Sequence, residues 1–284
     1  MARSIFKSGF LGIAVSIAAS SSALAASYST YVSGGGTDSG ACSFAAPCRT
    51  IQYALGQTFT NGQVHALNAA DFGAVSITRA VHIIGVPGAS LSRLASAPVV
   101  NVSAAAGAVE VDGFILDNLN PAANVTGILS ASSSITVKNC HIRGMTADGI
   151  RIDAPAGGKA IIENTVIERT GAYGLFIANS SGSMNAMVDR LTVIAAGTVG
   201  ILVNDAGVAW ISNTTVSSSG ISGIGVGIGT IVTLQNTTST GNSAFGLHIP
   251  SAGTSVFSAG NNSFTRNGSG PVGGAGTLTN VGSF

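Results

Sequence analysis

The feature that most constrains this chain of 284 residues is a short motif, a glycine followed by alternating apolar residues, that returns at a nearly constant interval. The segments GILS, GIRI, GLFI, GILV, GIGV and GLHI begin at Gly127, Gly149, Gly174, Gly200, Gly223 and Gly246. A second motif lies ten residues before the last five glycines and begins at Asn139, Asn164, Arg190, Asn213 and Asn236. The interval between the two motifs stays at ten residues while the interval between successive glycines varies, so the motifs mark a true internal repeat.

Each repeat is predicted to be one coil of a stack of strands. The apolar residues within a unit alternate, as Ile150 and Ile152 do, which is the pattern of a short strand with one buried face. Short strands joined by Gly, Asn and Ser corners predict an all-β parallel β-solenoid, in which each strand pairs with its equivalent in the next coil. Equivalent asparagines would then form a hydrogen-bonded asparagine ladder at one corner. Asn213 and Asn236 also match the N-x-S/T glycosylation pattern, but the ladder is favoured.

The Asn-x-x-apolar corner, the Gly-apolar-x-apolar strand and the segment YVSGGGTDSGACSFAAPCRTIQYALGQT resemble those of right-handed parallel β-helix proteins of the pectin-lyase-like superfamily. The resemblance covers about residues 28 to 265. It implies a right-handed parallel β-helix with an N-terminal capping region. The superfamily includes lyases, hydrolases, epimerases and proteins with no known reaction, so the resemblance transfers no catalytic residues to this chain.

The N-terminal 25 residues are predicted to be a cleaved secretory signal. They contain Arg3 and Lys7, an apolar run from Phe10 to Ala19, and small residues that end in Ala23-Leu24-Ala25. The apolar run is shorter than the roughly 20 residues that span a bilayer. We therefore expect a secreted or periplasmic protein without a transmembrane segment.

Residues 26–62 are expected to form an N-terminal cap, and residues 63–284 a β-helix that ends in an irregular, glycine-rich tail. A short helix that begins near Thr50 would cover the first coil with one apolar side. Cys42 and Cys48 are six residues apart, and the loop between them could close as a disulfide in an oxidising compartment. Cys140 remains, and its repeat position points inward, which predicts a buried and inert thiol.

Composition argues against a nucleic-acid partner. Loss of Arg3 and Lys7 from the 12 basic side chains leaves 10 against 11 acidic ones, so the mature chain lacks the excess of positive charge that such a partner requires. Only 8% of residues are charged. This low fraction suits stacked strands with small-residue turns.

The densest group of ionisable residues is VKNCHIRGMTADGIRI, residues 137–152, and it has two interpretations. In the structural one, Lys138 aligns with Asp112 and Glu163 of the adjacent coils, and Arg143 aligns with Glu168. Opposite charges at such cross-strand positions favour the correct register. In the functional one, Lys138 or His141 is a catalytic base and Arg143 neutralises a uronate carboxylate, as polyuronate elimination would require. The structural interpretation is favoured.

Further residues are candidates for binding a substrate, and they are Arg151, Asp153, Tyr173 and Phe176. Trp210 is an additional surface for sugar rings, and ordinary surface packing is the competing explanation for all three aromatic residues. The acidic residues Asp148, Asp153 and Glu168 are expected to point outward, and they form no acidic cluster that would suggest a glycosidase pair. No metal site or cofactor is predicted from the scattered histidines, although Ca²⁺ is not excluded.

The sequence therefore predicts an exported β-helix protein that binds carbohydrate or another extended polymer, such as one at a cell surface, along its exposed strands. Two alternatives remain open: a polysaccharide lyase that acts on acidic, uronate-containing polysaccharide, and a non-catalytic surface or scaffold protein. A groove lined by the basic residues would favour the enzyme, and ion pairs on a flat face would favour the scaffold. Whether the protein is catalytic, and its oligomeric state, are not predicted.

Overall fold

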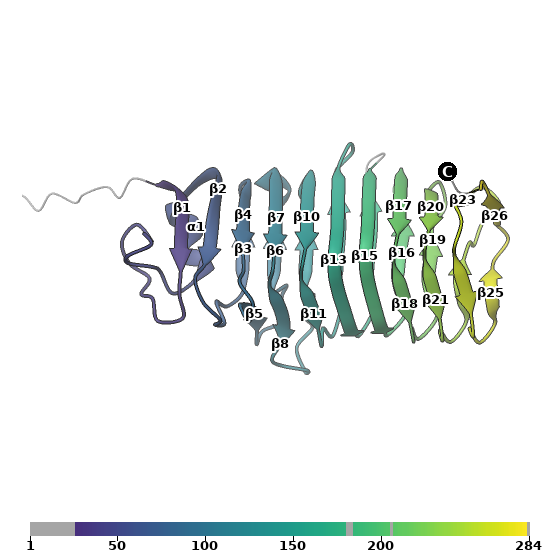
Figure 1. Ribbon diagram of the computed structural model, residues 1–284, viewed down its shortest axis with the longest axis horizontal. Coiled ribbons are helices and arrows are strands. Elements are labelled where there is room, and N and C mark those ends of the chain that lie inside the picture. The colour runs from purple at the N-terminus through teal and green to yellow at the C-terminus, as the bar shows by residue number, and fades with distance from the viewer. Residues whose placement is uncertain (1–25, 180–183, 205–206, 283–284) are drawn as a thin grey trace, which may run out of the picture.

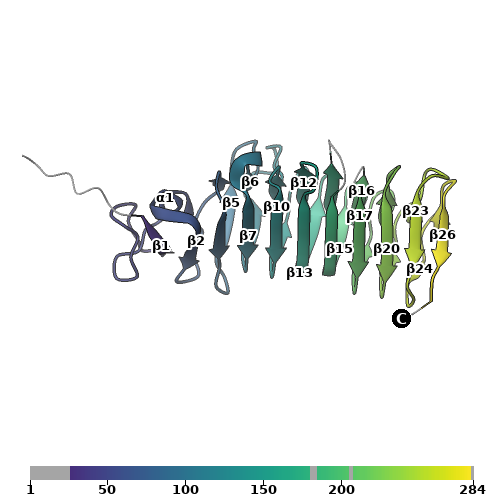
Figure 2. The same cartoon turned by 90° about the horizontal axis from the view of Figure 1, so that it is seen from above.

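The computed structural model describes residues 26–179, 184–204 and 207–282, and the predicted signal peptide at residues 1–25 lies outside them. The described chain winds into an elongated stack of short strands, with the N-terminal segment at one end of the long axis and the C-terminal segment at the other (Figure 1). The view from above shows the same order of strands along the axis (Figure 2). This is the predicted all-β parallel solenoid.

The strands form two sheets that run the length of the stack. Among the described residues, the larger sheet has 17 strands and the smaller sheet has nine. The larger sheet contains β1 (Ser27–Val32), β2 (Thr58–Ala66), β4 (Val81–Ile84), β5 (Ser90–Arg93), β7 (Ala108–Asp112), β8 (Ile115–Asn118), β10 (Ser134–Lys138), β11 (His141–Arg143), β13 (Lys159–Thr170), β15 (Asn185–Ala196), β17 (Val208–Ser212), β18 (Thr215–Ser217), β20 (Ile231–Gln235), β21 (Thr238–Thr240), β23 (Ser255–Ser258), β24 (Ser263–Thr265) and β26 (Thr277–Asn280). The smaller sheet contains β3 (Val75–Ile77), β6 (Val100–Val102), β9 (Ile128–Ser130), β12 (Ile150–Ala154), β14 (Leu175–Asn179), β16 (Ile201–Asn204), β19 (Ile224–Val226), β22 (Phe245–His248) and β25 (Gly270–Gly273).

Inward side chains of successive coils stack in register and make the core. Ile135 of β10 pairs with Val109 of β7 on one side and with Ala160 of β13 on the other, and all three are buried. The smaller sheet repeats the arrangement, with Ile150 between Ile128 and Leu175. Burial of each large aliphatic side chain contributes about 1.5–3 kcal/mol. The alternating pattern therefore predicts the inward face correctly.

The repeated glycine is required by close packing, as Gly149 shows. A Cβ atom at Gly149 would lie 2.4 Å from the Cγ2 atom of Ile167 and 2.6 Å from the carbonyl oxygen of Gly174. The second of these neighbours is backbone and cannot move aside without disturbing the next coil. Any larger residue would therefore push neighbouring coils apart.

The repeated asparagine is required by backbone conformation. Asn139 has a φ of 54° and Asn164 a φ of 45°, in the left-handed region where Asn is among the better tolerated residues. The side-chain amide of Asn164 donates to the Oδ1 atom of Asn139 at 2.7 Å, and that of Asn236 donates to Asn213 at 2.9 Å. Arg190 adopts the same backbone conformation between these pairs. The amides thus join neighbouring coils in pairs, and a ladder through every coil stays a prediction.

The N-terminal end of the stack is covered by the expected helix, α1 (Ile51–Gln57). Thr50 caps it by accepting a hydrogen bond from the backbone N–H of Tyr53 at 3.2 Å. Buried residues of the helix face the core, and they are Ile51, Ala54 and Leu55. The Cys42–Cys48 disulfide forms in the preceding loop. Strand β1 already pairs with β2, and the division of the cap from the solenoid at residue 62 stays a prediction.

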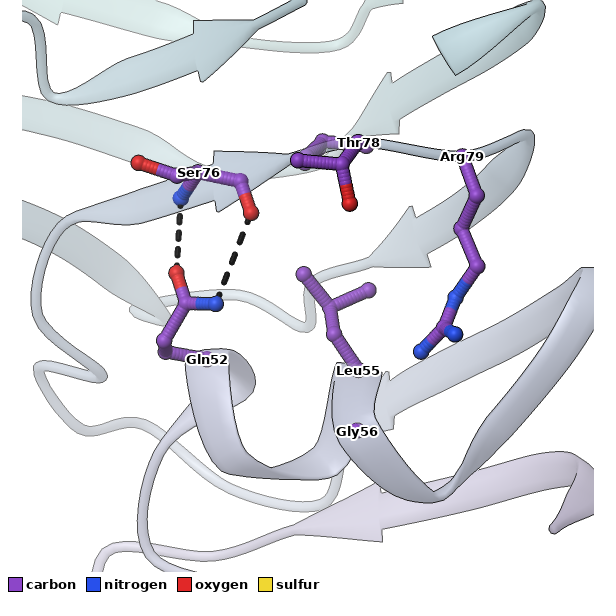
Figure 3. A pocket seen from close by; sticks show the side chains of 7 residues that line it. Gln52, Leu55, Gly56, Ser76, Thr78 and Arg79 are labelled. Atoms are coloured by element: carbon purple, nitrogen blue, oxygen red, sulfur yellow. Dashed lines mark hydrogen bonds between the residues drawn. The ribbon is translucent and has the colours of Figure 1, made fainter. Parts of the chain in front are cut away.

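A side chain of α1 also protects the edge of the smaller sheet, where β3 is the last strand. The Oε1 atom of Gln52 accepts the backbone N–H of Ser76 at 2.7 Å, as Figure 3 shows. The Nε2 atom of Gln52 lies 3.5 Å from the carbonyl oxygen of Ser76. This amide therefore takes the place that a neighbouring strand would occupy.

The C-terminal segment differs from the irregular tail that its glycine content predicts. Strand β25 pairs with β22 and strand β26 pairs with β23, both in parallel. The preceding coil provides an edge of backbone donors and acceptors, and pairing to that edge overrides the low strand propensity of glycine. Besides α1, the described residues contain one short 3₁₀ helix, η1 (Ala104–Ala106). No helix in this part of the chain is long and apolar enough to cross a membrane.

Candidate functional site

The residues predicted to bind a substrate come together on the outer face of the smaller sheet. Arg151 of β12 and Phe176 of β14 are direct neighbours in the sheet register. The guanidinium carbon of Arg151 lies 4.2 Å from the ring centroid of Phe176, within the range of a cation–π contact. The ring of Tyr173 lies 5.1 Å from that of Phe176, centroid to centroid. These three planar groups form one continuous surface.

Two carboxylates fix the position of Arg151. Its Nε atom donates to Asp153 at 2.9 Å, and its Nη1 atom donates to Asp148 at 3.3 Å. Burial opposes the charge of Arg151, but hydrogen bonds to Asp153 and Asp148 outweigh it and raise the pKa of the guanidinium. We call Asp148, Arg151, Asp153, Tyr173 and Phe176 the arginine–aromatic platform.

Asp148 holds the platform to the backbone. The residue was expected to point outward, but it is only 5% exposed. The expectation failed because Asp148 lies in the corner before Gly149, where the alternation of a strand does not apply. Its Oδ1 atom accepts the backbone N–H of Tyr173 at 3.1 Å, while its Oδ2 atom accepts from Arg151. One carboxylate therefore positions both the aromatic residue and the cation. Such a surface can stack against a sugar ring and donate hydrogen bonds to its oxygen atoms.

The predicted catalytic residue Lys138 lies on a different part of the molecule, on β10 of the larger sheet. Its register neighbours are Asp112 and Glu163, as expected. The ammonium forms ion pairs with Glu110 and with Asp112. The hydrogen bond to Glu110 is the main cause of the raised pKa of Lys138. A lysine held in its charged form is a poor proton acceptor.

The other two predicted catalytic residues, His141 and Arg143, are on β11, and each lies beside a carboxylate. The Nε2 atom of His141 lies 3.3 Å from Glu168. Arg143 donates from Nε at 3.1 Å and from Nη2 at 2.9 Å to one oxygen of Asp117. Arg143 has Glu168 as its register neighbour on one side, yet it pairs with Asp117 on the other side because Glu168 contacts His141 and Arg169.

The predicted catalytic and substrate-binding residues are thus divided between the two sheets. Arg143 borders a pocket of about 320 Å³, which is lined by Asp71, Gly88, Ser90, Ser92, Ile115, Asp117 and Leu119. Arg151 is not among the residues that line this pocket beside Arg143.

Cys140 is buried as predicted, and burial raises the pKa of its thiol to about 12. Its thiolate is therefore scarce at neutral pH.

Sequence reasoning missed one cluster, formed by His82 of β4 with Glu110 and Asp112 of β7. The histidine lies 28 residues before Glu110 in the sequence, ahead of the clear repeat, so no shared motif connects the two. The alternation in VHII and AVEVD is the sequence signal that could have indicated this cluster, because it places His82, Glu110 and Asp112 outward.

Comparison with known proteins agrees with this architecture. Residues 56–189 match the family model described as "Right handed beta helix region". The crystal structure of pectate lyase Pel9A superposes with a TM-score of 0.60 at 12% sequence identity, over 89% of this chain and 78% of that chain. The chain therefore has a right-handed β-helix fold of the kind seen in that pectate lyase. At this identity, the structural likeness establishes the fold alone.

Weaker structural matches to this β-helix protein include a tailspike. Tailspike protein 2 from the Escherichia coli O157:H7 bacteriophage CAB120 has a TM-score of 0.49 at 12% identity, over 73% of this chain and 35% of that chain. The A-module of the Azotobacter vinelandii mannuronan C-5 epimerase AlgE6 has a TM-score of 0.36 at 12% identity, over 79% of this chain and 91% of that chain. No curated protein matches the sequence.

Proposed function

We propose that this protein is exported and binds an extended carbohydrate along the exposed strands of the smaller sheet, without cleaving it. The observation that carries the proposal is the arginine–aromatic platform, in which planar side chains of adjacent coils lie in register. Aromatic faces and arginine donors are well suited to sugar rings, which present both C–H surfaces and hydroxyl groups. The Cys42–Cys48 disulfide supports an oxidising compartment.

The platform is part of a longer outward column. Successive register positions along the smaller sheet are occupied by Leu129, Arg151, Phe176, Leu202, Gly225 and His248. His248 stacks on Phe245 at 5.7 Å between ring centroids, which provides another planar group near the far end of the column. Coils advance by about 4.8 Å. A chain-like ligand that lies parallel to the long axis would meet these side chains one after another.

A lyase activity is the less favoured alternative. Elimination from a uronate needs a neutral base and a cation that is free to bind the substrate carboxylate. Lys138 is held charged by Glu110 and Asp112, and Arg143 is engaged by Asp117. These contacts favour a structural role for the stretch at residues 137–152. The pectate lyase of similar fold is named for a polyuronate, which supports testing acidic polysaccharides first.

A non-catalytic scaffold is a second candidate, and a specific observation favours it. Ion pairs cross from coil to coil, as between Lys138 and Asp112 and between Arg143 and Asp117. Such pairs stabilise the register of the stack without any ligand. In this case the regular surface would itself be the function.

The proposal is tested by affinity electrophoresis and calorimetry with polyuronates and neutral glucans, together with absorbance of unsaturated products. We expect binding of at least one polymer, no product, and about a tenfold loss of affinity in Phe176→Ala, equivalent to about 1.4 kcal/mol. Phe59→Ala is the matched control, because it removes an exposed phenylalanine from β2 of the larger sheet, away from the platform. Equal binding by wild type and Phe176→Ala would contradict the assignment of this face, and absence of binding to every polymer would favour the scaffold.

A further inference from the structure

The cluster of His82, Glu110 and Asp112 on the larger sheet has the composition of a metal site. One ligand atom from each residue lies within 4.8 Å of the other two. The Nε2 atom of His82 is 3.3 Å from Oε1 of Glu110 and 3.9 Å from Oδ2 of Asp112. These side chains come from adjacent coils, since His82 is the register neighbour of Glu110. The solenoid therefore brings an imidazole and two carboxylates to one point.

The separations suit a small tetrahedral ion. Bonds of about 2.0–2.1 Å to a zinc ion in tetrahedral geometry place ligand atoms roughly 3.3 Å apart. The His82–Glu110 separation already has this value, and the separation to Asp112 requires only a small side-chain rotation. Calcium is a poorer match, because it takes 6–8 oxygen ligands. The imidazole therefore selects for a transition ion.

The imidazole of the cluster is shielded and lacks an aligned partner. Nε2 of His82 has almost no solvent-accessible surface, and no hydrogen bond of ordinary alignment reaches it, although it lies 3.3 Å from Oε1 of Glu110. That oxygen is contacted by the ammonium of Lys138. Buried polar atoms normally have aligned partners, so the position of Nε2 needs an explanation. A cation held between the imidazole and the carboxylates would satisfy it.

Lys138 is the internal competitor for the same place. Its ammonium contacts Glu110 and lies 3.6 Å from Oδ2 of Asp112, so it binds the two carboxylates that an ion would need. The lysine reaches them from β10, one coil further along the stack. A bound ion would displace the ammonium toward solvent, where the side chain is already 32% exposed.

We propose that His82, Glu110 and Asp112 bind a divalent transition ion, with zinc as the representative, and that Lys138 competes with this ion for the carboxylates. The fourth ligand position would face the adjoining pocket of about 200 Å³, which His82 and Glu110 line together with Asn61, Val81, Ala108, Val109, Ser134 and Thr136. Three protein ligands and one open position are the arrangement of zinc sites that bind water or a further ligand. The site lies on the larger sheet and is independent of the platform.

Zinc titration of the intact mature protein by calorimetry at neutral pH tests the proposal. We expect binding of one zinc ion per chain, at least a tenfold loss of affinity in His82→Ala, and at least a tenfold gain in Lys138→Met, which removes the competitor. His248→Ala is the matched control, since it removes a half-buried histidine from the smaller sheet, and it should bind zinc as wild type does. Thermal melts of each variant without zinc identify any that fail to fold.

Three outcomes would overturn the proposal. The first is no zinc binding by either wild type or Lys138→Met. The second is equal zinc affinity in wild type and His82→Ala, which would place the ion elsewhere. The third is calcium binding as tight as zinc binding, which would show that the imidazole is not a ligand. A Glu110→Gln variant serves as a second test if His82→Ala does not fold, because it removes a ligand charge and keeps the side-chain shape.

Discussion

One outward column of the larger sheet changes character along the molecule while the coils beneath it keep the same pairing. In the N-terminal coils, the column contains His82, Glu110 and Thr136. In the following coils, the successive positions are Ile161, Met187, Trp210, Thr233 and Phe257. We call the first group of positions the charged half of the column and the second group the apolar half. The inward residues are apolar in both, so the fold constrains one face of each strand and leaves the other face free to differ.

The largest expected effect is on inward residues, and it should be alike in the two halves. Ile83 of β4 and Ile211 of β17 have no exposed surface. Substitution of either by alanine removes buried methylene groups and leaves a cavity, so we expect a loss of about 2–5 kcal/mol in the free energy of unfolding. Chemical denaturation measures it. A much smaller loss in one half would break the comparison, because it would show that the two cores are packed differently.

Matched outward substitutions provide the control for that experiment. Trp210→Ser alters an exposed side chain in the apolar half, and Thr136→Ala alters its counterpart column position in the charged half. Each should change stability by no more than about 0.5 kcal/mol. Effects of several kcal/mol at these positions would mean that the outward face also determines the fold.

A medium effect is expected at the corners. Asn139 borders the charged half and Asn213 the apolar half, with φ values of 54° and 49°. Alanine there should cost about 1–2 kcal/mol, since a Cβ atom without a compensating polar group disfavours the left-handed region. Glycine should cost less, because it adopts this conformation freely. Thermal melts of the four variants compare the halves, and glycine variants less stable than alanine variants would show that the amide bonds matter more than the backbone.

The smallest effect concerns pH and should appear in the charged half alone. Burial is the main cause that lowers the pKa of His65, and repulsion from His82 lowers it further. Burial also lowers the pKa of His82, where repulsion from Lys138 adds to the effect and attraction to Glu110 and Asp112 opposes it. The folded state thus favours the neutral imidazole. The resulting stabilisation is present above the unfolded pKa of about 6.5 and is lost as the pH falls below it.

Hydrogen exchange of backbone amides at several pH values measures this local effect. Protection of β2 and β4 should fall between roughly pH 7 and pH 5 by more than that of β17 and β20, after correction for intrinsic exchange rates. The variant His82→Gln should reduce the difference. Equal losses of protection in both halves would indicate that carboxylates shared by the whole molecule, and not these histidines, dominate the acid response.

The repeat made the fold predictable from the sequence, whereas the contacts between outward side chains could be predicted only in part. The Gly149 and Asn139 positions recur because packing and backbone conformation demand them, so their spacing identified the coils. Alternation also placed Arg151 and Phe176 on the same face. Arg143 has the predicted register neighbour Glu168 but pairs with Asp117, because strand register offers both carboxylates and side-chain geometry decides between them. The His82 cluster lies before the recognisable repeat and had no motif.

The amide of Gln52 has an implication for how these molecules behave in concentrated solution. A parallel stack of strands is a template for adding another strand, and the last strand of a sheet is where two molecules would join end to end. Because Gln52 already engages the backbone of Ser76 on β3, that edge is closed to a strand from a second molecule. A single side chain thus helps to keep the smaller sheet from extending into a fibril at its N-terminal end.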